Sequence, residues 1–538
     1  MTTDIALIQP PIRDFYLTAK RTFPYGLACI AAALMDGGLS VALIDALATA
    51  KSRPVDPPPE MRYLGDFYGR EDRSPFCLFH RYRHYGYSFE HVARLAAASG
   101  APLIGISSLF TAYSAEALET ARAVRAACPG AAIVMGGHHP TALFREVLDS
   151  GAVDFVLRGE GEAALPQLAA ALRDASPLER VPGLCYRRSN GQWHIAAPAL
   201  IPDLDGVPPP ALERVRRDFY QRRRRGSVVV TTSRGCPMGC SYCVLGSNTF
   251  PYRRRRVAAV MDEIRTAVDD WGAGFIDFED ENLSLDRSWF AELLARIRRR
   301  YGRRLELRAM NGLFPPSLDD DLIGAMQAAG FRTLNLSLGT CSPTQQRRFR
   351  RPDVRTSFEK AVFGAHRRGM RSVGYVIAAA PGQRAEDSLD DLLYLARLPV
   401  LAAVSVYYPA PGSRDYDRCR EKGLLPPRFS LMRSSALPIA DVTSRLQAVT
   451  LLRLSRLLNF MKQLADGGQA IPPPRPLEKG ARLSPGDRDR AGRRLLAAWR
   501  YDGRIRGLAS DGRVYDHRVD AALSRRFLAR LDTGKIRG

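Results

Sequence analysis

"SVVVTTSRGCPMGCSYC" (227–243) joins an apolar, strand-like run to a loop in which three cysteines follow at the spacing CxxxCxxC. Three thiolates in one loop fit a four-iron cluster in which one iron stays open to another ligand. Zinc usually takes paired CxxC elements or a nearby histidine, and no histidine lies between His194 and His366. We therefore interpret Cys236, Cys240 and Cys243 as ligands of an iron–sulfur cluster, with structural zinc or inert thiols as the alternative.

The cysteine loop follows the first of six strand-like runs that alternate with helical segments. The runs are 227–232, 275–280, 305–310, 333–338, 372–379 and 402–408. Six βα units in series predict an open, partial barrel, shorter than the complete barrel of eight units. Because such barrels carry their chemistry at the carboxyl ends of the strands, the cysteines lie where a reactive site is expected.

The N-terminal part of the chain shows a second alternation of strands and helices. Its five strand-like runs are 5–11, 40–47, 102–109, 131–137 and 153–162. This pattern predicts a doubly wound parallel sheet of the Rossmann or flavodoxin type, whose ligands lie beyond the carboxyl ends of the strands. The candidate ligand-binding residues at these ends are Gln9, Pro10, Pro11, Ser107, Ser108, Gly136, Gly137, His138, Gly159 and Glu160. No GxGxxG follows the first strand, which disfavours a dinucleotide site.

The predicted domains are a first domain at 1–180, a linker at 181–220, a barrel at 221–420 and a helical region at 421–538. The linker contains an "SNG" turn typical of a hairpin, followed by "PPP". An aromatic and charged insertion at 61–90 is either a surface subdomain or a cover over the cleft between the domains. The amphipathic segment 445–466 predicts a helix that caps the barrel, with contact to a membrane surface as a minor alternative.

Composition indicates a reducing compartment and a globular protein. The chain has 538 residues and nine cysteines, of which six are isolated, so a disulfide framework is not expected. No apolar run reaches the length of a transmembrane helix, and the N-terminus resembles no secretory leader, so we expect a cytoplasmic protein. The net charge of +23 suggests nucleic-acid binding, but the arginines are scattered through every segment. We therefore do not expect nucleic acid as a partner.

The motif CxxxCxxC with Tyr242, placed after the first strand of a six-unit series, resembles the radical S-adenosylmethionine (SAM) superfamily. The first domain resembles that of its cobalamin-binding branch, and the likeness covers about 1–415. It implies that the open iron binds SAM, with Tyr242 near the adenine. It also implies SAM contacts for Glu279, Asp280 and Glu281 in "FEDEN" (278–282), for Pro381 and Gly382 in "APG" (380–382), and for an arginine of "RRP" (350–352) at the SAM carboxylate.

Two positions depart from the family pattern. Gly339 stands where many members have an acid or amide, and glycine has no side chain to make the ribose or methionine contact. The DxHxxG motif of proteins that bind cobalt through histidine is absent from the sequence, and His138 and His139 lie in "GGHHP" (136–140) instead. We interpret these histidines as contacts to the corrin or to loops and not as cobalt ligands.

The resemblance implies three cofactors: a four-iron four-sulfur cluster, SAM and cobalamin. The favoured function is C-methylation of a small metabolite at an unactivated carbon, with a flavodoxin- or ferredoxin-type protein as the electron donor. Radical cyclisation, oxidation or rearrangement without methyl transfer is the main alternative. A cobalamin sensor and an RNA-modifying enzyme are further hypotheses. No residue is assigned a catalytic role from the sequence.

Overall fold

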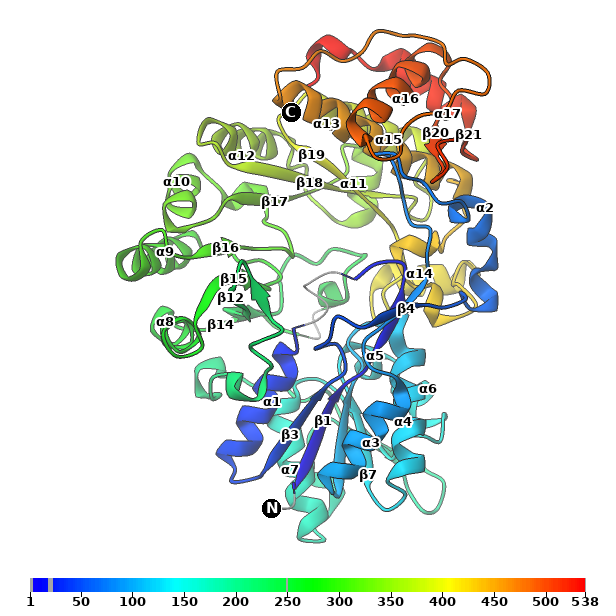
Figure 1. The fold of residues 1–538 in the computed structure, drawn as a ribbon. Helices are drawn as coiled ribbons and strands as arrows, with labels where there is room; N and C mark the ends of the chain where they lie inside the picture. Colours follow the sequence, from blue (N-terminus) through cyan, green and yellow to red (C-terminus); the bar gives the residue numbers. More distant parts are fainter. Residues whose placement is uncertain (1–2, 18–22, 248–249, 538) are drawn as a thin grey trace.

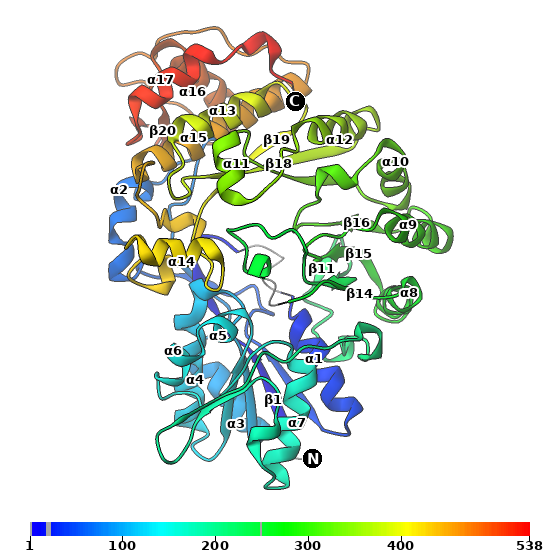
Figure 2. The ribbon, with the colours of Figure 1, turned by 180° about the vertical axis from the view of Figure 1, so that it is seen from behind.

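The structure is a computed structural model that describes residues 3–17, 23–247 and 250–537. The chain passes from an N-terminal sheet domain, through a half-open barrel, to a C-terminal helical region (Figure 1). The barrel lies between the two outer parts, as the view from behind also shows (Figure 2). No helix among the described residues is long and apolar enough to cross a membrane.

The first domain is built on a seven-stranded sheet in the order β10-β9-β8-β7-β6-β1-β3. Its strands are β1 (Ile5–Gln9), β3 (Val41–Asp45), β6 (Leu103–Ser107), β7 (Ala132–Gly136), β8 (Phe155–Leu157), β9 (Leu184–Arg187) and β10 (Trp193–Ile195). The five predicted strands are parallel, and β1 pairs with both β3 and β6. Counted along the chain their order is 2-1-3-4-5, the flavodoxin-like order, so the predicted doubly wound sheet is confirmed.

Helices cover both faces of this sheet. They are α1 (Tyr25–Asp36), α3 (Phe89–Ser99), α4 (Ser114–Ala127), α5 (His138–Ala142), α6 (Phe144–Leu148) and α7 (Gly161–Arg173). Because side chains alternate along a strand, Ile5 and Leu7 pack with α1 and α7 on one face, whereas Ala6 and Ile8 pack with α3 and α4 on the other. With both faces covered, the strands are continuous apolar runs, as buried parallel strands are.

The hairpin expected in the linker is formed by β9 and β10, but it belongs to the first sheet. β9 pairs antiparallel with β8, and β10 pairs with β9. The sheet therefore continues to Ile195, beyond the domain end expected at residue 180. The segment 196–220 then makes the connection to the barrel.

The six predicted barrel strands are all present, but they form two sheets. They are β12 (Arg225–Val230), β15 (Ala273–Phe278), β16 (Glu306–Arg308), β17 (Thr333–Gly339), β18 (Arg371–Ala378) and β19 (Leu401–Val406). The sheets β11-β12-β15-β16 and β17-β18-β19, where β11 is Gln221–Arg222, are joined by single bridges at Leu307–Phe331 and Leu313–Leu336. The helices around them are α8 (Val257–Arg265), α9 (Arg287–Tyr301), α10 (Asp320–Ala329), α11 (Pro343–Phe349), α12 (Arg355–Arg367) and α13 (Ala385–Ala396).

The C-terminal region closes the edge strand of the barrel. The predicted helix 445–466 is α15 (Arg445–Asp466), which packs on β19 and α13. The side-chain amide of Asn459 accepts from Ala402 N and donates to Ala402 O, at 2.8 and 2.9 Å. An edge strand that would expose unpaired backbone groups is thereby covered. The remaining elements are α14 (Arg414–Glu421), α16 (Arg488–Asp502), α17 (Ala521–Arg530) and the hairpin of β20 (Arg506–Leu508) and β21 (Val514–Asp516).

The insertion at 61–90 links the first domain to the C-terminal region. Its strand β5 (Arg83–Tyr85) pairs with β2 (Ile12–Asp14) and β4 (Ser52–Pro54), and it also contains the short helix α2 (Gly65–Tyr68). Met61, Leu64 and Tyr68 share a core with Ala448 and Val449 of α15. The insertion therefore packs against both the first domain and the C-terminal region, and its aromatic side chains lie in a core shared with α15.

Candidate functional site

A cavity of about 740 Å³ lies where the carboxyl ends of the first sheet meet those of the barrel. We call it the central cavity. From the first domain it is lined by Gln9, Ser107, Gly136, Gly137, His138, Gly159 and Glu160, among others. From the barrel it is lined by Cys236, Cys240, Tyr242, Cys243, Glu279, Glu281 and Arg351, among others. None of residues 61–90 is among the lining residues, so this insertion does not cover the cavity.

The cysteine loop is the end of a small two-stranded ribbon. β13 (Ser233–Arg234) pairs antiparallel with β14 (Arg253–Arg254), so the loop that carries the cysteines closes this ribbon. Gly235 has φ +81°, and a Cβ there would lie 2.4 Å from the carbonyl oxygen of Pro251. Only glycine fits this close approach without a shift of backbone. The ribbon therefore turns all three cysteines toward the central cavity.

The three thiols line one side of the central cavity, where the sequence predicts a cluster. Among the described residues, no three His, Cys, Asp or Glu side chains are grouped closely enough to hold one metal ion. In a four-iron cluster each cysteine is bonded to a different iron, so its ligands lie farther apart than those of one ion. Burial raises the pKa of Cys236, and it raises the pKa of Cys243 to about 11. Burial therefore favours the neutral thiol at Cys236 and Cys243, and a metal centre would displace these protons on binding.

Arg351 lies beside the cysteines and connects them to the barrel. It donates to the Tyr242 hydroxyl at 3.2 Å and to the carbonyl oxygen of Ser337 at 2.6 Å, and its Nη1 is 4.0 Å from Cys240 Sγ. Its Nε is buried and has no hydrogen-bond partner among the described residues. A Cβ on Gly339 would lie 3.1 Å from Arg351. The glycine that departs from the family pattern therefore makes room for this arginine.

The "FEDEN" segment presents different side chains to the cavity from those expected. Glu279 and Glu281 line the central cavity, as does Asn282, which was not singled out from the sequence. The Oδ1 atom of Asn282 is buried and has no hydrogen-bond partner among the described residues. A buried acceptor of this kind fits a ligand that carries a donor, such as an ammonium group.

Asp280 is a structural residue outside the lining of the cavity. Its carboxylate accepts from Thr232 N at 3.0 Å, from Thr232 Oγ1 at 2.7 Å and from Ser233 Oγ at 2.6 Å. Burial raises its pKa, and the hydrogen bonds from Ser233 and Thr232 oppose that shift. This side chain joins the ends of β12 and β15, so it lies apart from the cavity lining in which its SAM contact was expected.

Replacing Asp280 by alanine is expected to lower the free energy of unfolding by about 3 kcal/mol, because several buried donors lose their acceptor. Denaturant or thermal unfolding of the full chain measures the effect. The matched control is Glu281→Ala, which removes the neighbouring, exposed carboxylate and should leave the unfolding midpoint close to that of the natural chain. Equal stability of Asp280→Ala and the natural chain would contradict this assignment.

Pro381 and Gly382 lie outside the set of described residues that line the cavity. The backbone N–H of Gly382 donates to Asp441 at 2.8 Å, and its carbonyl oxygen accepts from Arg348. The turn after β18 is thus tied to the surface next to α11 and the C-terminal region. The "APG" turn therefore lies away from the described cavity lining, where its contact with SAM was expected.

Seven of the ten residues that were predicted at the strand ends of the first domain line the central cavity. Pro10, Pro11 and Ser108 are not among the described lining residues. Ser108 is buried beneath the loop after β7, where its carbonyl oxygen accepts from His139 N at 3.2 Å. Ser107, the last residue of β6, lines the cavity, whereas Ser108 follows the strand and is buried in the protein.

The two adjacent histidines have different surroundings. His138 lines the central cavity, and its side chain is exposed to that cavity. The protein atoms around the cavity reduce the hydration of the imidazole, which lowers its pKa. His139 is buried, contacts Thr111 at 3.4 Å and packs against Phe429, and burial lowers its pKa to about 4. Of these two histidines, His138 is the one placed to meet a ligand.

Gly137 brings the backbone of the loop after β7 close to its neighbour. It has φ +117°, and a Cβ there would lie 2.6 Å from Ser108 O. We expect Gly137→Val to reduce cobalamin retention at least about tenfold, because the loop must move out of position. The corrin absorbance of the purified protein measures retention, and cluster absorbance should persist. Gly130→Ala, at an open position, is the control, and full retention by Gly137→Val would contradict the expected contact of this loop with cobalamin.

Several residues of the cavity were missed by the sequence analysis. They include Tyr25, Arg234, Phe250, Arg253, Asn311 and Phe314. Arg234 lies two positions before Cys236, the first cysteine of the motif. This closeness to the motif could have marked it as a candidate site residue. Tyr25 lies in a helix of the first domain, and only the tertiary arrangement brings it to the barrel.

Comparison with known proteins identifies both domains. The B12-binding domain family matches residues 78–169, and the radical SAM superfamily matches residues 230–395. The chain contains a B12-binding domain followed by a radical SAM domain. The predicted cofactor set of cobalamin, SAM and a four-iron cluster is confirmed at the level of these two families.

Two curated proteins and one solved structure illustrate what this chain is similar to. An uncharacterized methyltransferase of Pyrococcus horikoshii is 24% identical over 63% of this chain and 73% of its own length. The anaerobic magnesium-protoporphyrin IX monomethyl ester cyclase of Cereibacter sphaeroides is 29% identical over 43% of this chain, which spans only 38% of the cyclase. The structure of the radical SAM methyltransferase TsrM from Kitasatospora setae, with cobalamin and cluster bound, has a TM-score of 0.58, 18% identity and 78% coverage of each chain. That likeness supports the fold.

Proposed function

We propose that this radical SAM protein is a cobalamin-dependent methyltransferase that acts on a carbon atom of a small molecule. The observation that carries the proposal is the central cavity, which is lined on one side by the cysteine loop and on the other by the strand ends of the B12-binding domain. One cavity can therefore present both cofactors to the same substrate carbon. Such positioning of reactive groups supplies a large part of enzymatic rate enhancement.

The residues of the cavity fit the proposed cofactors. Cys236, Cys240 and Cys243 would hold the cluster. The unpartnered Asn282 Oδ1 suits the SAM amino group, and the unpartnered Arg351 Nε suits the SAM carboxylate. The loops that contain Gln9, Ser107, Gly136, Gly137, His138, Gly159 and Glu160 would hold cobalamin.

When bound, SAM with the cluster supplies a 5′-deoxyadenosyl radical and cobalamin supplies a methyl group. The part played by the chain is to orient these groups and to exclude water. Phe110, Phe250 and Phe314 line the central cavity and give it an apolar wall. Such a wall protects a reactive species from side reactions with solvent.

The remaining partners follow from this chemistry. We propose a flavodoxin- or ferredoxin-type protein as the electron donor and the reducing cytoplasm as the compartment. Nine unpaired cysteines agree with a reducing environment. We propose no nucleic-acid partner, since many of the arginines are used in ion pairs within the chain, as Arg234 and Arg253 are.

Radical cyclisation without methyl transfer is the second candidate function. The likeness to the anaerobic cyclase favours it, although the chain spans less than half of that relative. Both candidates need the same cofactors, so the structure of the cofactor sites does not separate them. The fate of the SAM methyl group does.

The proposal is tested by supplying SAM with a deuterated methyl group and a metabolite extract to the reduced protein. Mass spectrometry should find the label in a product, with S-adenosylhomocysteine and 5′-deoxyadenosine in comparable amounts. A product that forms with 5′-deoxyadenosine but with neither label nor S-adenosylhomocysteine would contradict methyl transfer and favour cyclisation. The Cys240→Ala variant is the matched control for background reactions.

A further inference from the structure

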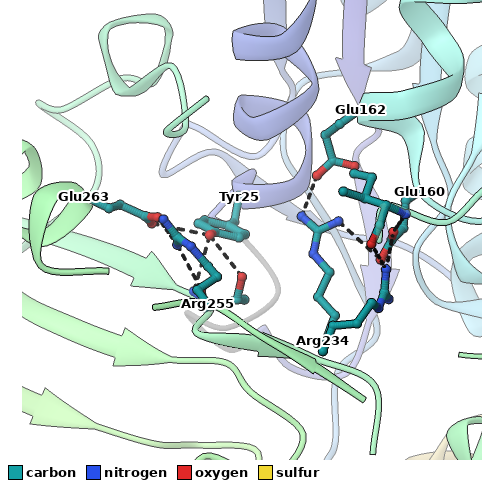
Figure 3. Close-up of polar contacts among 9 residues, drawn as sticks. Tyr25, Glu160, Glu162, Arg234, Arg255 and Glu263 are labelled. Atoms are coloured by element: carbon teal, nitrogen blue, oxygen red, sulfur yellow. Dashed lines mark hydrogen bonds and ion pairs between the residues drawn. The ribbon is translucent and has the colours of Figure 1, made fainter. Parts of the chain in front are cut away.

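Two arginines in the stem of the cysteine loop, which is the ribbon of β13 and β14, form ion pairs with the first domain. Arg234 on β13 and Arg253 on β14 are directly paired across the ribbon that the loop closes. Their partners are Glu160 and Glu162, at the start of α7 in the B12-binding domain. We call these four residues the interdomain clamp. Figure 3 shows Arg234 pointing from the barrel toward Glu160 and Glu162.

The clamp is a network of charge-assisted hydrogen bonds. Arg234 Nη2 lies 2.6 Å from Glu162 Oε1, and its Nη1 lies 3.4 Å from Glu160 Oε1. Arg253 binds both oxygens of Glu160 in a fork, with two distances of 2.8 Å. Glu160 also accepts from Ile201 N at 2.6 Å. A forked arginine fixes direction as well as distance, which a single contact does not.

The burial of the clamp side chains indicates that the interdomain clamp fixes how the two domains are arranged. The side chains of Glu162, Glu160 and Arg253 are only 7%, 10% and 12% exposed. Buried ion pairs add little net stability, because removal of charges from water offsets their attraction. Their directional bonds can nevertheless select one arrangement of two domains.

A second contact joins the first domain to Thr231, just before the stem of the cysteine loop. The Tyr25 hydroxyl of α1 lies 3.0 Å from Thr231 Oγ1 and 3.3 Å from Glu263 Oε1, both within hydrogen-bond distance. Glu263 is paired with Arg255, as Figure 3 shows. The strand end before the cysteine loop is thus attached to the first domain on two sides. The interdomain clamp is the contact that the ribbon of β13 and β14 makes itself.

We propose that the interdomain clamp positions the cysteine loop relative to the B12-binding domain and so sets the separation of the cluster from cobalamin. This inference rests on the proposed function for its two cofactors. Arg234, Arg253 and Glu162 act as positioning residues, because no contact with a cofactor is assigned to them. Glu160 connects them to the loop that would hold cobalamin. Loosening the clamp should change the distance between the cofactors without removing either one.

The test compares the natural chain with a double variant that combines Arg234→Met and Glu162→Leu, which removes an ion pair without leaving a buried charge alone. Pulsed electron paramagnetic resonance measures the distance between the reduced cluster and cob(II)alamin in the full protein. We expect a longer or broader distance distribution in the variant. Glu162→Gln, a milder change of the same contact, should shift it in the same direction if the double variant folds poorly.

The control removes a different buried ion pair between the first domain and the rest of the chain. Arg433→Met with Asp14→Asn removes a contact of 3.3 Å that is not part of the loop stem. It should lower the melting temperature and leave the distance distribution unchanged. An unchanged distribution in both clamp variants, or equal broadening in the control, would overturn the inference.

Hydrogen exchange gives a readout that needs no cofactor. In the cofactor-free protein, amides of the ribbon at 233–234 and 253–254 should exchange faster in the clamp variants than in the natural chain or the control. Equal exchange would overturn the inference. If the natural chain does not retain both cofactors, the proposed function fails, and hydrogen exchange still decides whether the clamp fixes the loop.

Discussion

Replacement of Cys236, Cys240 or Cys243 by alanine is expected to remove the cluster and to lower SAM cleavage at least about 100-fold. Each thiolate is bonded to a different iron in such a cluster, so the loss of one leaves an iron without its protein ligand. All three side chains line the central cavity from one loop. Absorbance of the reconstituted protein measures the cluster, and 5′-deoxyadenosine measures cleavage.

The control for these variants is Cys128→Ala at the end of α4, a half-buried cysteine far from the loop in sequence. It should retain the full cluster absorbance and the full rate of cleavage. Normal cleavage by any one of the three loop variants would show that its thiol is not a ligand, and the assignment of the cavity would then be wrong.

Replacement of Arg351 by methionine is expected to weaken SAM binding about 100-fold, equivalent to about 2.8 kcal/mol, while the cluster absorbance persists. The guanidinium connects Ser337, Tyr242 and the cysteine loop, and it offers one unpartnered buried donor to a ligand. Arg351→Lys should recover only part of the affinity, because lysine lacks the planar fork. Equilibrium binding of SAM to the reconstituted protein measures the effect.

Arg347→Met, on the exposed side of α11, is the matched control for loss of a positive charge, and it should bind SAM as the natural chain does. Unchanged affinity in Arg351→Met would contradict the place given to SAM in the cavity. Loss of the cluster in that variant would instead make Arg351 a structural support of the cysteine loop.

The strands and the cysteine loop were predictable because their patterns are local. Apolar runs such as 5–9 and 227–230 are buried on both faces, and residues directly after such strands meet at one edge of a sheet. Gln9, Ser107, Gly136 and Cys236 could therefore be placed at the cavity from the sequence. The sequence left the order of the first sheet open between the Rossmann and flavodoxin types, and the structure shows the flavodoxin-like order.

The orientation of side chains beyond the strand ends was less predictable. In "FEDEN", the turn after Phe278 directs Asn282 to the cavity and buries Asp280 under Thr232 and Ser233. The period-two rule ends with the strand, so it does not decide between these neighbours. Arg234 and its partner Glu162 are 72 positions apart in sequence, and only the packed domains bring them together.

The most direct test of the central claim is metal and corrin analysis of the full chain after anaerobic purification and reconstitution. The account predicts about four irons, a similar amount of acid-labile sulfide and one cobalamin per chain. Zinc in place of iron, or a chain that binds the cluster but no cobalamin under the same conditions, would contradict a cavity that holds both cofactors.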